Sequence, residues 1–262
     1  MEPMAGGLAR GTGSGRRLNA VIERAPFTAA ELLIVVISRL LADCRHVIVG
    51  ASSPIPGAGA LLARAQGGGR LHVDVLGSQR HNHFTNGGVE TFDLAAQGRV
   101  DAFFLGGGQI DGEANINLVG TGGYPLGGVR WPGCFGSSYL YFLVPRVILF
   151  REEHTRRVFV PRVDFISAPG TSPPGVYRPG GPWKLVTGLG ILAFDRERRR
   201  FALESVHPGH SVEEILNHTG FGIDVPAAVP QTPPPDGAVL ALLRRQVRAE
   251  IGETYPRFAA AM

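Results

Sequence analysis

Three short apolar segments in the first half of the chain alternate with helix-forming segments, and this alternation constrains the fold most. The segments are "HVIVGA" (46–51), "LHVDVLG" (71–77) and "DAFFLGG" (101–107). Each has the length and the branched or aromatic content of a buried strand. Strands that are apolar on both faces and separated by helices form parallel sheets with helices on both faces. We therefore predict an α/β fold with a mostly parallel open sheet.

Helices are expected before and between these strands. Thr28 precedes the apolar segment "AAELLIVVISRLLAD" as an N-cap, and Glu31 stands where it completes a capping box. The segment "SSPIPGAGALLARAQ" is expected to be a loop that continues into a second helix, and "VETFDLAAQG" a short helix closed by Gly98. Ligands of such sheets bind beyond the carboxyl ends of the strands, so the following loops should line one crevice. These loops are 50–58, 77–88 and 106–117.

The second half of the chain is richer in strand-like segments. These are "YFLVPRVILF", "RRVFVPRVDFIS", "WKLVTGLGILAFD" and "RRFALESVHPG". A short helix "SVEEILNHTG" capped by Ser211 and a last helix beginning after Asp236 complete the prediction. Residues 170–181 are rich in proline and glycine but lie between strands, so they indicate a loop and not a linker. We expect one domain over 25–258, preceded by a disordered segment at 1–24.

Composition excludes several classes of protein. The net charge is +4, but the basic residues are spread along the chain without lysine-rich runs, so nucleic-acid binding is not expected. Residues 1–20 lack the apolar core of a signal peptide, and the longest apolar run, 32–37, is too short to cross a membrane. Two cysteines, Cys44 and Cys134, do not make a disulfide framework. We expect a soluble cytoplasmic protein without a membrane partner.

The loop after the second strand, in "LHVDVLGSQRHNHFTNGG" (71–88), raises three alternatives: a metal site, a catalytic loop or a plain turn. His81 and His83 stand two residues apart beside Arg80 and Asn82. A cysteine or glutamate at zinc-ligand spacing is lacking, so no metal is expected. His81 and His83 remain candidate catalytic residues.

Glycines after the third strand are candidate ligand-binding residues. "GGGQIDG" matches neither G-x-G-x-x-G nor the P-loop pattern, so a dinucleotide site is not indicated. Three glycines at a carboxyl edge serve either tight turning or close approach of the backbone to a ligand. We favour the second interpretation for Gly106, Gly107, Gly108 and the adjacent Gln109.

The segments, taken in order, resemble a known family over residues of about 28–255. The matching pieces include "GRVDAFFLGGGQID" followed by "NIN", "RWPGCFGSS", "GPWKLVTGLGILAFD", "LESVHPGHSVEEILNHTGF" and "VPQTPPP". They resemble the β subunit of family I CoA-transferases, glutaconate CoA-transferase in particular. The resemblance implies a NagB/RpiA/CoA-transferase-like fold and an α-subunit partner, as a heterodimer or α2β2 assembly. It also implies a coenzyme A thioester as substrate, no permanently bound cofactor, and an active site between the subunits.

The family's chemistry implies a glutamate nucleophile at a strand end, which in this chain falls in "VDVLGS". The position corresponds to Val75 or Leu76, neither of which can attack a thioester. Asp74 is the nearest carboxylate and the remaining candidate, although strand alternation turns it to the face opposite Val75.

Two more positions depart from the family's pattern. Phe135 replaces a glycine in "GCFGSS", where the resemblance implies that Gly133, Gly136 and Ser137 help to bind the thioester and its oxyanion. Ala114 replaces a glycine in "DGEANIN".

Three functions stay open at this point. The first is CoA transfer between carboxylic acids, with Asp74 or a partner carboxylate as nucleophile. The second is an acyl-CoA hydrolase, ring-opening or decarboxylase-type subunit in which His81, His83 and their neighbours polarise the acyl group. The third is a non-catalytic subunit that supports an active α chain.

Overall fold

The computed structural model describes residues 26–125 and 127–262, so the segment predicted to be disordered, 1–24, lies outside the described residues. The helical segments are α1 (Ala29–Leu40), α2 (Pro54–Gln66), α3 (Gly87–Ala96), α4 (Ser137–Leu143), α5 (Val212–His218), α6 (Gly237–Leu242), the π-helix η1 (Leu243–Val247), α7 (Arg248–Ile251) and α8 (Pro256–Ala261). The strands of the main sheet are β1 (His46–Val49), β2 (His72–Val75), β3 (Ala102–Leu105), β8 (Arg146–Arg151), β9 (Pro182–Thr187), β10 (Gly190–Asp195) and β11 (Arg200–Val206). Two small ribbons pair β4 (Gln109–Ile110) with β5 (Ile116–Asn117), and β6 (Gly120–Thr121) with β7 (Val129–Arg130).

The main sheet has the strand order β11-β10-β9-β8-β3-β1-β2. The strands from β2 to β9 are parallel neighbours, whereas β10 and β11 run antiparallel at the far edge. The predicted α/β fold with a mostly parallel sheet is confirmed. The antiparallel edge follows from short connections, because β9 and β10 are separated by two residues only.

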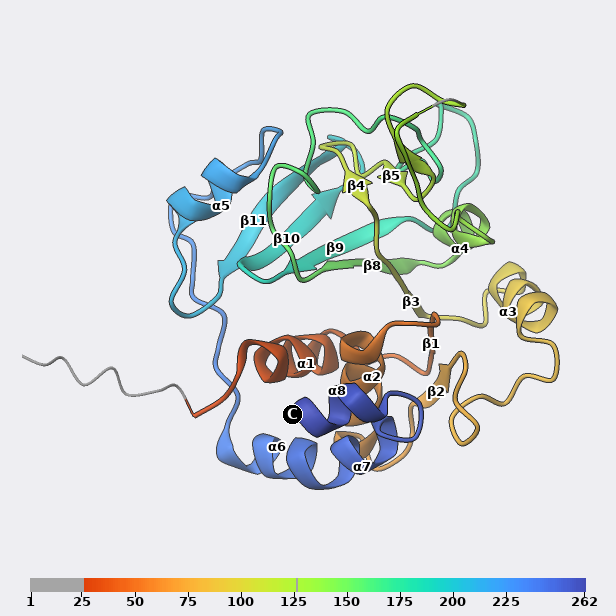
Figure 1. Cartoon of the computed structure of the whole chain (residues 1–262), viewed down its shortest axis with the longest axis vertical. Coiled ribbons are helices and arrows are strands. Elements are labelled where there is room, and N and C mark those ends of the chain that lie inside the picture. Colours follow the sequence, from red (N-terminus) through yellow and green to blue (C-terminus); the bar gives the residue numbers. More distant parts are fainter. Residues whose placement is uncertain (1–25, 126) are drawn as a thin grey trace, which may run out of the picture.

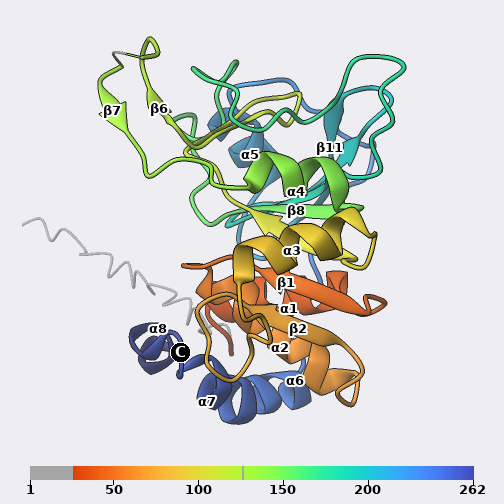
Figure 2. The ribbon, with the colours of Figure 1, turned by 90° about the vertical axis from the view of Figure 1, so that its right-hand side faces the viewer.

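The sheet separates two apolar cores. Val47 and Val49 of β1 face the core formed with α1, α2 and the C-terminal helices, whereas Ile48 faces the core that contains α4 and the β4–β5 ribbon. Figures 1 and 2 show these two layers, with α6, α7 and α8 lying beyond α2. The alternation of side chains along each strand thus decides which layer a residue belongs to.

The predicted helix starts are confirmed. The Thr28 hydroxyl accepts from the Glu31 amide at 3.2 Å, and the Glu31 carboxylate accepts from the Thr28 amide at 2.8 Å. Asp236 caps α6 in the same way, through the Val239 amide at 2.8 Å. Among the helices that the structure describes, none is both long and apolar enough to cross a membrane.

Two strand predictions in the second half are wrong. The first part of "YFLVPRVILF" belongs to α4, and the strand β8 begins only after Pro145. The segment "RRVFVPRVDFIS" forms a loop that touches the β4–β5 ribbon through an isolated bridge at Phe159 and a second one at Ala168, directly after the segment. Pro161 has no amide hydrogen, so this segment cannot form a continuous ladder.

Candidate functional site

The carboxyl ends of β1, β2, β3 and β8 open into one cavity of about 840 Å³. Its lining includes residues of 50–53, Leu76, Gly87, Gly88 and 103–108, so the three predicted loops do meet at one crevice. Further lining comes from Phe92 of α3 and from the turn 131–135 that precedes α4. A smaller cavity of about 400 Å³ shares part of this lining and extends toward Glu152 and Glu153.

The glycines after β3 allow close backbone packing at the cavity wall. A Cβ on Gly108 would lie 2.2 Å from the Trp131 ring, and one on Gly107 would lie 2.9 Å from Ile116. Gly106, Gly107 and Gly108 all line the cavity. These contacts explain why Gly107 and Gly108 lack side chains by packing, while the binding of a ligand by the three glycines stays a prediction.

Gln109 has a different surrounding. Its side-chain Oε1 accepts from Asn117 Nδ2 at 2.8 Å and from the Asp164 amide at 3.0 Å. The residue is buried and does not belong to the cavity lining. These contacts position the β4–β5 ribbon beneath the glycines.

The turn before α4 brings the other predicted binding residues together. Gly133 has φ +106° and lines the cavity, while a Cβ on Gly136 would lie 2.0 Å from Phe92 Cζ. The Ser137 amide already donates to the Cys134 carbonyl at 2.9 Å. Its hydroxyl, in contrast, is buried at the cavity without a partner among the described residues. The Ser137 amide is thus already paired, and the predicted role of Ser137 in binding stays a prediction.

Both positions where the chain departs from a family glycine have left-handed backbone. Ala114 has φ +59° and Phe135 has φ +44°. Such conformations cost L-residues about 1–2 kcal/mol relative to glycine. The backbone expected for glycine is therefore kept, and Phe135 adds a phenyl ring, 85% exposed, to the cavity lining.

The two residues at which the resemblance implies a nucleophile, Val75 and Leu76, lie on different sides of the sheet. Leu76 lines the cavity, whereas Val75 is buried in the core that contains α2. Asp74 lies on the face of β2 opposite Val75, but it does not line the cavity. In this chain the strand end therefore presents an alkyl side chain where the resemblance implies a carboxylate.

Sequence reasoning did not single out Arg151 and Arg157, which also line the cavity. Arg151 ends β8, and its buried Nε has no partner among the described residues. Arg157 pairs with Glu153, which also lies 3.6 Å from Arg151 Nη2. A signal was present, because Arg151 directly follows the buried strand residues "VILF" and so stands at the carboxyl edge of the sheet.

The two histidines of the loop after β2, His81 and His83, contact different parts of the molecule. His81 packs toward the C-terminal helices, with its Nδ1 3.1 Å from Arg64 Nη1 and its Nε2 3.8 Å from Glu250 Oε2. Burial, aided by the charge of Arg64, lowers the pKa of His81. The amide of His81 is held by the hydroxyl of Ser78, which itself donates to Glu253. His81 does not line the cavity.

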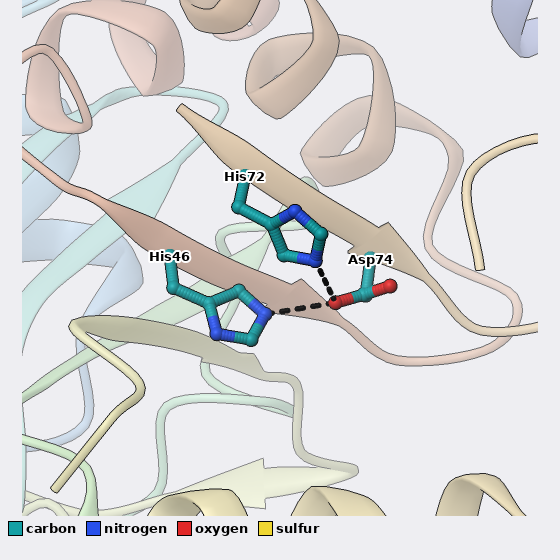
Figure 3. A group of neighbouring side chains, drawn as sticks. All are labelled: His46, His72 and Asp74. Carbon is teal, nitrogen blue, oxygen red and sulfur yellow. Dashed lines mark hydrogen bonds and ion pairs between the residues drawn. The ribbon is translucent and has the colours of Figure 1, made fainter. Parts of the chain in front are cut away.

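His83 joins Asp74 instead. Asp74 is fully buried, and its Oδ1 accepts from the His83 amide and lies 2.9 Å from His83 Nδ1. Its Oδ2 lies 2.8 Å from His46 Nε2 and 3.1 Å from His72 Nε2, as Figure 3 shows. Burial opposes the charge of Asp74, but the hydrogen bonds from His46 and His83 outweigh it and lower the pKa to about 2. Asp74 is therefore an anion surrounded by three imidazoles.

Comparisons with known proteins show the family to which the chain belongs. The family model of coenzyme A transferase matches residues 33–218. The β subunit of the glutaconate CoA-transferase of Acidaminococcus fermentans is 34% identical over 151 residues, which are 55% of this chain and 56% of that protein. The crystal structure of that organism's enzyme superposes with a TM-score of 0.75 at 25% identity, over 86% of this chain and 98% of the other.

Two further relatives carry different functional names. The β subunit of the 3-oxoadipate CoA-transferase of Pseudomonas knackmussii is 32% identical over 153 residues, or 56% of this chain and 58% of that protein. The cholesterol ring-cleaving hydrolase IpdB subunit of Rhodococcus jostii is 28% identical over 159 residues, which are 59% of this chain and 62% of that protein. The chain spans less than two thirds of the length of each of these curated relatives. Because the family model covers most of the chain, the chain belongs to the coenzyme A transferase family.

Proposed function

We propose that this chain is the β-type subunit of an enzyme that acts on an acyl-CoA thioester and transfers coenzyme A between carboxylic acids. The observation that carries the proposal is the composition of the cavity at the strand ends. The backbone of Gly106–Gly108 can approach a thioester closely, and the Trp131 and Phe135 rings offer an apolar wall to an acyl chain. Arg151 and Arg157 can pair with a substrate carboxylate or phosphate.

An α-type chain is proposed to complete the site, as a heterodimer or an α2β2 assembly. Among the described residues that line the 840 Å³ cavity there is no aspartate or glutamate. The oxygens of Asp74 are already engaged by His46, His72 and His83. A transferase carboxylate is therefore expected from the partner subunit. The exposed rings of Phe135 and Tyr139 beside the cavity are suited to contact with such a chain.

A second candidate function is hydrolysis, ring opening or decarboxylation of an acyl-CoA without a covalent glutamate. Leu76 is the observation that favours it, because an alkyl side chain at the nucleophile position cannot form an acyl-enzyme. One relative is named a ring-cleaving hydrolase subunit. In this reaction the chain would bind and orient the thioester while water or a partner residue attacks it.

Co-expression with a partner α chain allows the two functions to be separated. The complex is supplied with an acyl-CoA and an isotope-labelled acceptor acid, and the formation of labelled thioester is compared with the release of free CoA. Transfer requires the label to appear in the new thioester, and hydroxylamine should trap an enzyme-bound thioester. Release of free CoA at the same rate with or without acceptor would refute CoA transfer and support hydrolysis.

An arginine variant tests whether this chain's cavity takes part at all. Arg151→Ala should raise KM for the acyl-CoA, because it removes a cation from the cavity lining. Arg198→Ala is the matched control, since Arg198 pairs with Asp224 away from the cavity. Equal kinetics for the two variants would favour a non-catalytic role for the chain.

A further inference from the structure

Three histidines converge on one buried carboxylate outside the cavity. His46 begins β1 and His72 begins β2, and the parallel register places the two residues side by side. Asp74 follows two residues later on the same face of β2, and His83 reaches it from the loop after β2. The ring centroid of His72 lies 4.6 Å from those of both His46 and His83. The group thus joins two strands and a loop at one edge of the sheet (Figure 3).

The hydrogen-bonding pattern of His46 calls for a cation. Its Nδ1 lies 3.2 Å from the Arg99 carbonyl oxygen, which can only accept, so Nδ1 must carry a proton. Its Nε2 lies 2.8 Å from the carboxylate oxygen Asp74 Oδ2. A neutral imidazole has a single N–H and leaves one of these contacts as two facing lone pairs. A metal ion bound to both Nε2 and the carboxylate oxygen would resolve this conflict.

We propose that His46 Nε2, His72 Nε2 and Asp74 Oδ2 form a binding site for a zinc-like divalent cation. These three atoms lie within 4.8 Å of one another, and two imidazoles with one carboxylate are a donor set typical of zinc sites. The carbonyl of Arg99 would hold the other ring nitrogen of His46, which is the usual orienting contact of a metal-bound histidine. His83 would orient the carboxylate through Oδ1. A fourth position is left for water.

Two of the three spacings between the donor atoms are close to what a tetrahedral ion needs. Ligand atoms about 2.1 Å from zinc lie roughly 3.4 Å apart in a tetrahedral site. The two contacts to Asp74 Oδ2 are 2.8 and 3.1 Å, so binding requires them to open by a few tenths of an ångström. The side chain of His72 is 48% exposed and has room to turn.

A bound ion would fix the loop that leads to the cavity wall. His83 stands four residues before Gly87, which lines the cavity at the start of α3. Through Asp74 the ion would tie β1, β2 and this loop together. The inference concerns a structural site and does not depend on the proposed activity.

Zinc titration of the full chain tests the site directly. Metal-free protein is dialysed against Zn²⁺ and the bound metal is measured, with Co²⁺ absorption in the visible range as a report on tetrahedral nitrogen and oxygen ligation. We expect one ion per chain and a rise in Tm on binding. His72→Ala should weaken binding by more than about 100-fold, and His83→Ala by about 10–100-fold.

His210→Ala is the matched control, because His210 also pairs with a carboxylate, Glu214 at 3.0 Å, but belongs to no cluster of three ligands among the described residues. It should bind zinc as the unchanged chain does. Asp74→Asn provides a second test if a histidine variant folds poorly. Failure of the unchanged chain to bind zinc, or equal binding by the unchanged and His72→Ala chains, would overturn the proposal.

Discussion

Two buried histidines, His154 and His207, should make stability depend on pH well above the range in which carboxyl groups titrate. His154 lies between the hydroxyls of Thr187 and Thr219, at 2.8 and 3.0 Å. His207 lies between the Thr232 hydroxyl and the Thr187 carbonyl, at 2.8 and 3.0 Å. Burial lowers the pKa of each ring from 6.5 to about 4. Both rings are therefore neutral in the folded chain at neutral pH.

Whether acid stabilises or destabilises the fold depends on which state, folded or unfolded, binds the proton. Between pH 6.5 and 4 the unfolded chain takes up a proton at each ring and the folded chain does not, so acid favours unfolding. The difference between the folded and unfolded pKa contributes about 3 kcal/mol per histidine to the free energy of unfolding. About 2 kcal/mol of this contribution is lost when the pH falls to 5. For the pair, the free energy of unfolding should fall by about 4 kcal/mol between pH 7 and pH 5. The lowered pKa values of His72 and His81 act in the same direction.

Urea unfolding at pH 7, 6 and 5 measures this slope. The window stays above the range in which Glu31, Glu153 and Glu253 gain protons, so histidines dominate it. His154→Gln and His207→Gln should each remove about half of the slope, whatever they do to stability at pH 7. A free energy of unfolding that is flat between pH 7 and 5, or that rises in acid, would refute the reasoning.

Three further outcomes are expected. Gly108→Ala should destabilise the fold by about 1–3 kcal/mol and change tryptophan fluorescence, because the new Cβ would collide with Trp131, whereas Gly222→Ala meets open space and should be nearly neutral. Ser137→Ala should alter the free energy of unfolding by less than about 0.5 kcal/mol in urea, since its hydroxyl has no partner among the described residues; a larger loss would contradict the described contacts. Asp236→Ala should lower the free energy of unfolding by about 1 kcal/mol in thermal unfolding, because it removes the cap of α6. Asp236→Asn should keep most of this stability, because its side-chain oxygen can accept the same hydrogen bond.

The parts of the fold that were predictable depend on local signals. The capping box of Thr28 and Glu31 acts over three residues, and the apolar runs that became β1, β2 and β3 are short and bounded by polar residues or glycine. The secondary-structure predictions failed where tertiary contacts determine the structure of a segment. "YFLV" is as apolar as a strand, but Leu140 and Tyr141 bury their side chains from α4, and the Tyr141 hydroxyl bonds to Ala114.

The site was predictable in position but not in composition. Parallel topology indicated where the loops would meet, and strand alternation indicated that Asp74 turns away from Val75. The pairing of His46 with His72 requires the register of β1 against β2, which no single segment contains. A signal existed in hindsight, because the strands "HVIV" and "HVDV" both begin with histidine and would align if they are parallel neighbours.

The contact between α2 and the C-terminal helices has a consequence for synthesis on the ribosome. Leu243, Val247 and Ile251 belong to the same apolar core as α2, and the Tyr255 hydroxyl accepts from the Ser53 amide at the cavity. The layer that is translated first is thus closed by segments translated nearly two hundred residues later. Until then the face of α2 that these segments cover stays exposed, and exposed apolar surface of this kind favours aggregation of an incomplete chain.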